Sequence, residues 1–434
     1  MPDAIHVHPH DVRDEGASRV VEEITNRTGL RTIVAEVVTL EERHPYPRGQ
    51  LPHNPRHSVI VSRATLEVPL AAGLFAGLSV RPLLSSAARA GEDYLQTLRA
   101  AAQPHGTAVI PWLKALNGAF AGEPEAICVR IVGGKPIATW LCPNRAETAE
   151  VVSRLAQGVL ERHPATAVLL DRFRYPDWSG AEVAPERLLT CFCDTCRELM
   201  EKDGIDLVLL ETELARLTAL AHRDPRLLLT RGLPLPARDA LEHWLAFRQK
   251  SITTLVTTVA ERLRAWGRET GHFAGELWLN LWPPSFAPLL GQDYRALGTV
   301  CDGAKHFPYH RLGGGADLAG LVESIAGRER PALREEVFRA LLALLRLPGA
   351  PTLESFLREG FPVEFVKRET ALAKEAFGPG TPVFAGIQAW DTPLEEIGTA
   401  CRAARNGGAD GLFFYCYGWA GLEALDEIGR ILAR

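Results

Sequence analysis

The sequence predicts an α/β protein with the architecture of a (β/α)8 TIM barrel, and three observations support this fold class. Eight apolar runs of strand length recur along the 434 residues, separated by helical patterns. Most of the runs are continuously hydrophobic, as expected for parallel strands that helices cover on both faces. Eight strand–helix units close such a barrel, whose reactive side chains lie on the loops that follow the strands.

The expected strands, in chain order, are Thr32–Leu40, Leu78–Leu84, Thr107–Leu116, Ala167–Phe173, Gly275–Trp282, Gly303–Tyr309, Val383–Trp390 and Gly411–Tyr417. The helices expected between them are Glu92–Ala102, Ala146–Glu161, Arg238–Arg268, Asp293–Leu297, Ala316–Ile325 and Leu394–Arg405. A short repeat accords with repeated units: Gly91-Glu92-Asp93-Tyr94 and Gly291-Gln292-Asp293-Tyr294 each place an acidic residue where a helix opens. Four residues can also recur by chance.

We expect the whole chain, residues 1–434, to form one elaborated barrel with long insertions after the fourth and sixth strands. Residues 177–271 hold a cysteine cluster and the long helix. Residues 311–380 hold helices at Leu333–Leu345 and Val363–Phe377. Segments that follow strand ends build the lids and pockets of a barrel.

Three shorter segments are expected at the same end of the barrel. A hairpin of Ile127–Val132 and Pro136–Leu141, with Gly133-Gly134 as its turn, follows the third strand. The Pro-rich stretch His44–Pro55 follows the first strand. Gly313-Gly314-Gly315 follows the sixth and is interpreted as a lid hinge or a weak anion cradle.

Composition and charge restrict the class of protein. The formal net charge is −5, which gives no reason to expect a nucleic-acid partner. The first residues lack a basic stretch followed by an apolar one, and no run of about 18 apolar residues occurs. We therefore expect a cytoplasmic protein without membrane contact, and homo-oligomerisation is left open.

Four of the eight cysteines have the spacing of a metal site. Cys191, Cys193 and Cys196 lie within one turn, and Cys142, after the expected hairpin, can supply a fourth thiolate. Four thiolates are typical of structural Zn²⁺, which then has no open position at which to activate water. The cofactor prediction is structural zinc, with free thiols as the alternative. The remaining cysteines are expected as small buried apolar residues: Cys128, Cys301, Cys401 and Cys416.

The cysteine spacing after the fourth strand resembles the zinc site of the zinc-containing β-galactosidases, which are (β/α)8 enzymes. More broadly, the chain resembles a largely uncharacterised family of bacterial glycoside-hydrolase-like barrels. The resemblance implies the barrel fold and an activity on carbohydrates. The segments that carry it are His10-Asp11-Val12-Arg13-Asp14-Glu15-Gly16, Pro52-His53-Asn54-Pro55, Ser79-Val80-Arg81-Pro82, Leu141-Cys142-Pro143, the strand ending in Asp171, and Cys191–Arg197.

Two positions depart from the β-galactosidases. Their acid/base is a Glu that follows an Asn at the end of strand four, where this chain has Leu170-Asp171. Their nucleophile is a Glu at the end of strand seven, which here contains Gln388 and Trp390. Their mechanism therefore cannot be transferred residue by residue.

Asp171 is the first candidate for a catalytic carboxylate. Glycoside hydrolysis usually needs two carboxyl groups, one protonated and one ionised. A charged residue at the carboxyl end of an apolar strand is expected to point into the barrel mouth. Arg174 could orient Asp171 and lower its pKa, which suits a nucleophile or base. A purely structural ion pair with Arg172 or Arg174 is the alternative.

The general acid has weaker candidates. Glu276 faces the interior by pleat parity but lies near the start of its strand. Asp391 closes the seventh strand, although Asp391-Thr392-Pro393 also has the pattern of a helix N-cap. Glu36 is interpreted as a buried partner of Arg81 or Lys305.

Polar and aromatic residues near strand ends are expected to form the substrate site. Lys305, Tyr309 and His310 could bind hydroxyl groups or move a proton. Six aromatic residues near strand ends have flat apolar faces that suit sugars: Trp112, Trp282, Trp390, Tyr415, Tyr417 and Trp419. The residues expected to contact substrate are Arg81, Lys114, Arg174, Asn280, Tyr309, His310, Gln388, Trp390 and Tyr417.

Histidines near the chain start alternate as His6-x-His8-x-His10, and His53 and His57 lie near another expected strand end. Solvated or locally packed side chains are favoured here over a catalytic metal site. No P-loop, dinucleotide glycine fingerprint or Gly-x-Ser-x-Gly elbow occurs.

The sequence favours a glycoside hydrolase-like enzyme that acts on a small-molecule or oligosaccharide substrate. Asp171 is the expected nucleophile or base, and Glu276 or Asp391 the expected acid. One alternative is a lyase or isomerase with a Lys, His or Tyr base from the sixth strand. The other is a non-catalytic sugar-binding barrel, suggested by the missing Glu on strand seven.

Overall fold

The computed structural model describes residues 1–40, 52–53, 64–178, 185–223, 235–311, 318–327, 329–347 and 352–433. Its centre is a closed barrel of eight parallel strands, in which β1 pairs with both β2 and β12. The predicted fold class, a TIM barrel, is confirmed. The barrel strands are β1 (Ala4–Val7), β2 (Thr32–Glu36), β4 (Ala108–Lys114), β8 (Ala167–Asp171), β9 (Glu276–Leu281), β10 (Gly303–His306), β11 (Val383–Gln388) and β12 (Gly411–Tyr415).

The first two predicted strands need correction. The prediction omits Ala4–Val7, because four residues that include a histidine give no apolar run. The predicted strand Leu78–Leu84 is wrong as a barrel strand: Val80–Pro82 forms β3, which pairs antiparallel with β5 (Phe120–Gly122) outside the barrel. Its proline and its exposed arginine fit an edge strand and do not fit a strand covered on both faces. The predicted first strand is therefore the second of the barrel.

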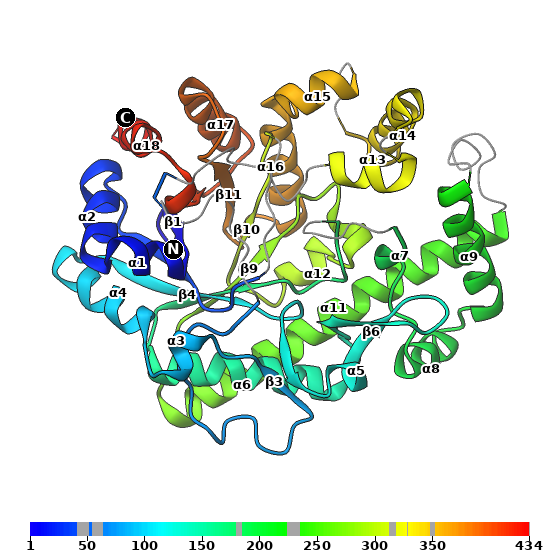
Figure 1. The fold of residues 1–434 in the computed structure, drawn as a ribbon, viewed down its shortest axis with the longest axis horizontal. Helices are drawn as coiled ribbons and strands as arrows, with labels where there is room; N and C mark the ends of the chain where they lie inside the picture. The colour runs from blue at the N-terminus through cyan, green and yellow to red at the C-terminus, as the bar shows by residue number, and fades with distance from the viewer. Residues whose placement is uncertain are drawn as a thin grey trace.

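Helices surround the barrel on its outside (Figure 1). Around the ring lie α1 (Pro9–Glu15), α2 (Ala17–Thr28), α4 (Tyr94–Ala102), α6 (Ala146–Arg162), α11 (Leu235–Thr270), α12 (Tyr294–Gly298), α16 (Glu364–Phe377), α17 (Leu394–Asn406) and α18 (Leu422–Leu432). The helices α18 and α2 lie side by side, and Arg27 donates to Asp426 Oδ1 across 2.8 Å. Sequence-distant helices thus close the ring as the strands β1 and β12 do.

Further elements lie between the barrel units. The expected hairpin is present as β6 (Cys128–Arg130) and β7 (Pro136–Leu141). Shorter helices are α3 (Ser86–Arg89), α5 (Pro124–Ile127), α7 (Pro185–Leu188), α8 (Asp194–Lys202), α9 (Leu207–Arg223), α13 (Ala319–Ala326), α14 (Pro331–Leu344) and α15 (Leu353–Glu359). Gly313-Gly314-Gly315, His57 and most of His44–Pro55 lie outside the described residues. The division into one barrel with two insertions stays a prediction.

The repeated Gly-x-Asp-Tyr segment has the same structural role in both copies. Asp93 and Asp293 each accept hydrogen bonds from backbone amides of the helix that follows. Tyr94 and Tyr294 each donate their hydroxyl to a backbone carbonyl at or just after the end of the preceding barrel strand. Each copy therefore opens a helix and fixes it to the carboxyl end of a strand.

Inside the barrel, side chains form layers that follow the pleat. An apolar layer fills the lower part: Ala4, Val34, Ile110, Trp112, Ala167, Leu169, Trp278, Phe384 and Phe413. Positions that lie two or four residues farther along each strand face inward again. These positions change from apolar to polar, so the mouth differs chemically from the base.

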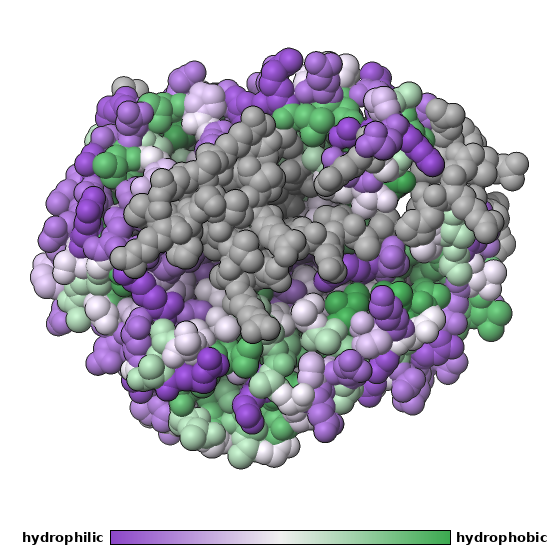
Figure 2. All heavy atoms as spheres, viewed as in Figure 1, coloured by the Kyte–Doolittle hydropathy of each residue, from purple (hydrophilic) through white to green (hydrophobic). Residues whose placement is uncertain are grey.

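The outer surface is mixed. On the face shown in Figure 2, hydrophilic and hydrophobic side chains alternate among the coloured residues, as on helices that turn one side to a core. Within the described ranges, no helix combines the length and the apolar character needed to cross a membrane.

Candidate active site at the carboxyl ends of the strands

The mouth of the barrel is lined by one inward-facing side chain from each strand or the residue just after it. We name this set the mouth ring: His8, Glu36, Lys114, Asp171, Asn280, Lys305, Gln388 and Tyr415. Its members other than Tyr415 are at most 5% exposed. Charged side chains are rarely buried this deeply unless they are paired, so the pairings define the chemistry of the site.

Asp171, at the end of β8, is held by several donors. Trp112 Nε1 donates to Oδ2 at 2.9 Å, and the Arg172 amide donates to Oδ1 at 2.6 Å. Arg174 Nη1 lies 3.3 Å from Oδ1. Burial alone would raise the pKa of Asp171, but Arg174, Arg172 and a hydrogen bond from Asn280 hold it below its usual range. Asp171 is therefore ionised at neutral pH.

Arg174 connects Asp171 to a second buried carboxylate. Its Nε donates to Asp177 Oδ2 at 2.7 Å, and Arg172 Nη1 lies 3.4 Å from the same oxygen. The guanidinium also lies 5.6 Å from the centroid of the Trp282 ring. Because its position is fixed on three sides, Arg174 can orient Asp171.

Glu36, at the end of β2, forms the other charged group of the mouth ring. It pairs with Lys114, and its Oε2 accepts from His8 Nδ1 at 2.6 Å. Burial would raise the pKa of Glu36, but Lys114 and His8 lower it to about 2. Burial would lower the pKa of His8, but Glu36 and the Cys416 thiol raise it well above its usual value. The interpretation of Glu36 as a partner of Arg81 or Lys305 is wrong.

Lys305, on β10, has a different environment. Its Nζ donates to Tyr309 Oη at 3.0 Å, and no carboxylate oxygen of the described residues lies within 4.0 Å of it. Burial lowers its pKa to about 7, which Asp171 opposes and Arg174 assists. The pKa of Lys305 therefore lies near neutrality.

Aromatic rings pack around the mouth. Trp390, Tyr415 and Trp419 form a cluster with centroids 5.3–5.6 Å apart and edge-to-face angles. Tyr309 stacks on Tyr415 at 5.7 Å. Trp112 lies deeper, where its indole contacts both the His8 ring, at 5.9 Å, and the Asp171 carboxylate.

The two expected acids do not belong to the mouth ring. Glu276 pairs in register with Ala167, four residues before Asp171, which places it roughly 13 Å lower at about 3.3 Å per residue. Its half-exposed carboxylate accepts from Trp278 Nε1 at 2.7 Å. Asp391 is exposed after β11, and the N-cap of α17 is Pro393. The cap interpretation of Asp391 is therefore wrong, and Glu276 does not face Asp171 across the mouth.

Other predicted contact residues lie in two places. Asn280, Tyr309 and Gln388 are at the mouth, as are Lys114, Arg174 and Trp390. Arg81 is exposed on β3, outside the barrel. His310 Nε2 lies 3.2 Å from Glu396, and Tyr417 donates to Glu15 Oε2 at 2.9 Å, so both have partners on the surrounding helices or loops.

The alternating histidines belong to the barrel. His6 and His8 are fully buried, so of the two expected arrangements, solvated or locally packed, they have the packed one. His6 packs on Trp112 at 4.6 Å and on Tyr415 at 5.4 Å. The alternation of Ala4, His6 and His8 with apolar residues is the period of a strand, and this signal could have identified β1 and His8.

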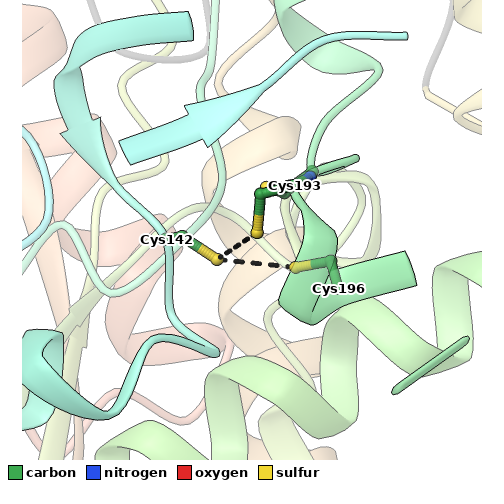
Figure 3. A group of neighbouring side chains, drawn as sticks. Cys142, Cys193 and Cys196 are labelled. Atoms are coloured by element: carbon green, nitrogen blue, oxygen red, sulfur yellow. Dashed lines mark hydrogen bonds between the residues drawn. The ribbon is translucent and has the colours of Figure 1, made fainter. Parts of the chain in front are cut away.

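The four predicted metal ligands converge in the structure. Cys142, Cys191, Cys193 and Cys196 are buried, and their sulfur atoms all lie within 4.8 Å of one another. Figure 3 shows Cys142, after β7, pointing at Cys193 and Cys196 at the start of α8. The sulfur of Cys142 lies 3.7 Å from that of Cys193 and 3.4 Å from that of Cys196.

These distances fit a tetrahedral metal site. A Zn–S bond of about 2.3 Å gives sulfur–sulfur edges of about 3.8 Å. They are far longer than a disulfide bond. Three N–H groups point at the sulfurs: the Arg130 and Cys193 amides at Cys191, and Asn144 Nδ2 at Cys196. Such donors stabilise metal-bound thiolates. No other group of three or more potential ligands occurs in the described part of the chain.

Comparisons with known proteins identify the fold. No family model matches this chain. No curated protein matches it either. Among solved structures, the glycoside hydrolase domain of PgaB (BpsB) from Bordetella bronchiseptica is similar, with a TM-score of 0.51 and 13% identity over 96% of this chain and 94% of that chain.

A second similar structure is the catalytic domain of beta-amylase from Paenibacillus polymyxa. Its TM-score is 0.54 at 10% identity, and the match covers 99% of this chain and 97% of that one. At such identities the likeness concerns the fold alone. The chain therefore shares the barrel fold of these two domains, and its likeness to zinc-containing β-galactosidases stays a prediction.

Proposed function

We propose that this chain is a glycoside hydrolase-like enzyme whose reaction takes place at the mouth ring, between Asp171 and His8. One observation carries the proposal: the ring holds two titratable groups whose pKa values are shifted in opposite directions, downward for Asp171 and upward for His8. Such a pair supplies an ionised group and a protonated group at the same pH, as acid–base catalysis requires.

Asp171 suits the role of the carboxylate. The transition state of glycoside hydrolysis carries positive charge on the sugar ring, which an ionised carboxylate stabilises. Asp171 can either attack the anomeric carbon or activate water. Its donors, Trp112, Asn280 and Arg174, fix the orientation of the oxygens before substrate arrives, so little reorganisation is needed.

His8 suits the role of proton donor. Its Nδ1 faces Glu36, which keeps the imidazole protonated and leaves Nε2 to donate to the leaving oxygen. Glycosidases usually use a second carboxyl group here. We assign His8 because Glu276 lies at the other end of the barrel and Asp391 is exposed, whereas His8 is buried in the ring. The indole of Trp112 contacts both proposed groups and sets their spacing.

A carbohydrate substrate is supported by the lining and by the comparisons. Trp390, Tyr415 and Trp419 present ring edges and faces at the mouth, and such surfaces suit the C–H faces of sugars. The two similar solved structures are a glycoside hydrolase domain and a beta-amylase domain. A cytoplasmic location and the state of assembly stay predictions.

The test is hydrolysis of a panel of aryl glycosides and oligosaccharides by the wild type, Asp171→Asn and Glu276→Gln. We expect Asp171→Asn to lose about 100- to 10,000-fold in kcat, the usual contribution of a positioned acid or base. Glu276→Gln is the matched control, because Glu276 lies inside the same barrel at the opposite end. It should retain the wild-type rate.

Other outcomes would redirect the proposal. Equal rates for wild type and Asp171→Asn would remove Asp171 from the mechanism. Saturable sugar binding without turnover at any pH would indicate a non-catalytic sugar-binding barrel. Activity that is lost in Lys305→Met and kept in Asp171→Asn would favour a lyase or isomerase.

We also propose that Cys142, Cys191, Cys193 and Cys196 hold one structural Zn²⁺. Four thiolates would complete the coordination of the metal, so it would tie α8 to the hairpin and would not activate water. Metal analysis of protein purified without chelator should give about one zinc per chain. Cys193→Ser should lose the zinc and lower Tm, whereas Cys301→Ser, at an isolated buried cysteine, should keep the metal. Zinc-free protein in which all four thiols react in the native state would contradict the assignment.

A further inference from the structure

Lys305 is the charged member of the mouth ring that the hydrolytic proposal leaves unused. Its side chain passes close to Gly386 of the neighbouring strand β11. A Cβ at that glycine would lie 2.9 Å from Lys305 Cε, so the absence of a side chain there makes room for the lysine stem. The stem is thereby directed to the mouth, where Nζ reaches Tyr309 Oη at 3.0 Å.

The surroundings of Nζ disfavour a positive charge. The side chain is buried, and within the described ranges it has no carboxylate partner closer than 4.0 Å. The rings of Phe307, Tyr309 and Tyr415 have centroids 5.0, 5.3 and 5.9 Å from Nζ, and such rings attract an ammonium less strongly than a carboxylate partner would. A buried ammonium without an anionic partner is costly, so the neutral amine gains population.

Burial is the main cause that lowers the pKa of Lys305 to about 7. Asp171 across the mouth raises the pKa and Arg174 lowers it. His6, in the layer below, has its own pKa lowered by burial and by Lys305, so it stays neutral and adds no charge. A large fraction of Lys305 is then unprotonated at neutral pH, when ordinary lysines are almost fully protonated.

The other charges of the mouth limit what can bind beside Lys305. Lys114 is neutralised by Glu36, and Arg174 by Asp171 and Asp177. Lys114 and Arg174 thus already have carboxylate partners, which makes them less available to a phosphate or a carboxylate group. Asn280, level with Lys305 on the neighbouring strand, offers an amide that suits hydroxyl groups.

We propose that Lys305 forms an imine with the carbonyl group of an open-chain hydroxyaldehyde or hydroxyketone bound at the mouth. The lone pair of Nζ attacks the carbonyl carbon while the C=O π electrons move to oxygen, and one proton passes from nitrogen to that oxygen to give a carbinolamine. The hydroxyl group then takes a second proton and leaves as water while the nitrogen lone pair forms C=N, and the protonated imine releases its remaining N–H proton to give the neutral imine. Tyr309, whose hydroxyl is in contact with Nζ, relays these protons. This inference does not rest on glycoside hydrolysis.

Reductive trapping tests the proposal on the intact protein. Glycolaldehyde and dihydroxyacetone are the probes, sodium cyanoborohydride reduces any imine at pH 7, and peptide mass analysis locates the adduct. We expect adduct at Lys305 on the order of a hundredfold faster than at an average exposed lysine, because far more of its amine is neutral. Tyr309→Phe should slow trapping at Lys305 at least tenfold and alter its pH profile.

Two variants complete the experiment. Lys305→Met removes the amine but keeps an unbranched apolar side chain, and thermal unfolding checks that it folds. It should lose the fast adduct, whereas Lys250→Met, at a lysine that is 67% exposed, should not. Labelling confined to surface lysines overturns the proposal, since a site that does not admit glycolaldehyde is no carbonyl site. A wild-type trapping rate in Tyr309→Phe would overturn the role of Tyr309.

Discussion

The base and the mouth of the barrel interior are built from the same strands, yet they differ in chemistry. On β9, Trp278 fills the base and Asn280, two residues later, faces the mouth. On β2, Val34 and Glu36 have the same relation, as do Leu169 and Asp171 on β8. Burial of apolar surface at the base stabilises the folded state, whereas burial of charged groups at the mouth costs desolvation free energy. Polar groups kept at such a cost are good candidates for function.

The largest expected effect on stability distinguishes the base from the mouth along the strand β9. Trp278→Ala removes a fully buried indole and should lower the free energy of unfolding by about 3–5 kcal/mol. Asn280→Ala should lower it by about 1 kcal/mol, while it weakens turnover or imine trapping at the mouth. Urea unfolding of both variants measures the difference. A similar loss of stability in both would contradict the functional interpretation of the mouth.

The next effect probes charge pairing within the mouth. Lys114→Met leaves Glu36 with only His8 as a partner, and breaking a buried pair should cost about 3 kcal/mol. Adding Glu36→Gln to Lys114→Met should recover part of this loss, because no unpaired charge remains. The double-mutant cycle, measured by urea unfolding, gives the coupling directly. Additive losses would show that the pair is not coupled.

The smallest effect concerns Lys305 and depends on pH. Its folded-state pKa is about 7, and the unfolded value is about 10.4, so between these pH values the unfolded chain binds a proton that the folded chain lacks. The wild type should therefore gain stability from this group as pH rises from 7 to 10. Lys305→Met should be more stable than wild type by about 1–2 kcal/mol at pH 6, and this advantage should shrink toward pH 10. A constant advantage would mean that Lys305 titrates normally.

The sequence predicts more of the base than of the mouth. Continuous apolar runs identify most of the barrel strands, because the strands are covered on both faces. The strand Ala4–Val7 escapes this signal, since its inward position is occupied by His6. Pleat parity and strand ends correctly place Asp171 and Asn280 at the mouth.

The ion pairs within the mouth cannot be predicted from such sequence patterns. Glu36 and Lys114 are 78 positions apart, and the direct pairing of β2 with β4 brings them into contact. The cysteine cluster is easier to predict, because three of its members lie within six residues of one another in the sequence and Cys142 follows a recognisable hairpin. Parity alone also suggests Glu276, since it does not distinguish the start of a strand from its end.

The pairing of β1 with β12 sets an order of events during synthesis. His8 follows the first strand, and its neighbours Tyr415 and Trp419 follow the last. The ribosome adds about 5–20 residues per second, so the first strand waits roughly 20 to 80 seconds for its second neighbour. Throughout this interval β1 has an unpaired edge, the kind of surface that chaperones cover and that aggregation exploits. The proposed proton donor is therefore made long before the strand that completes its surroundings.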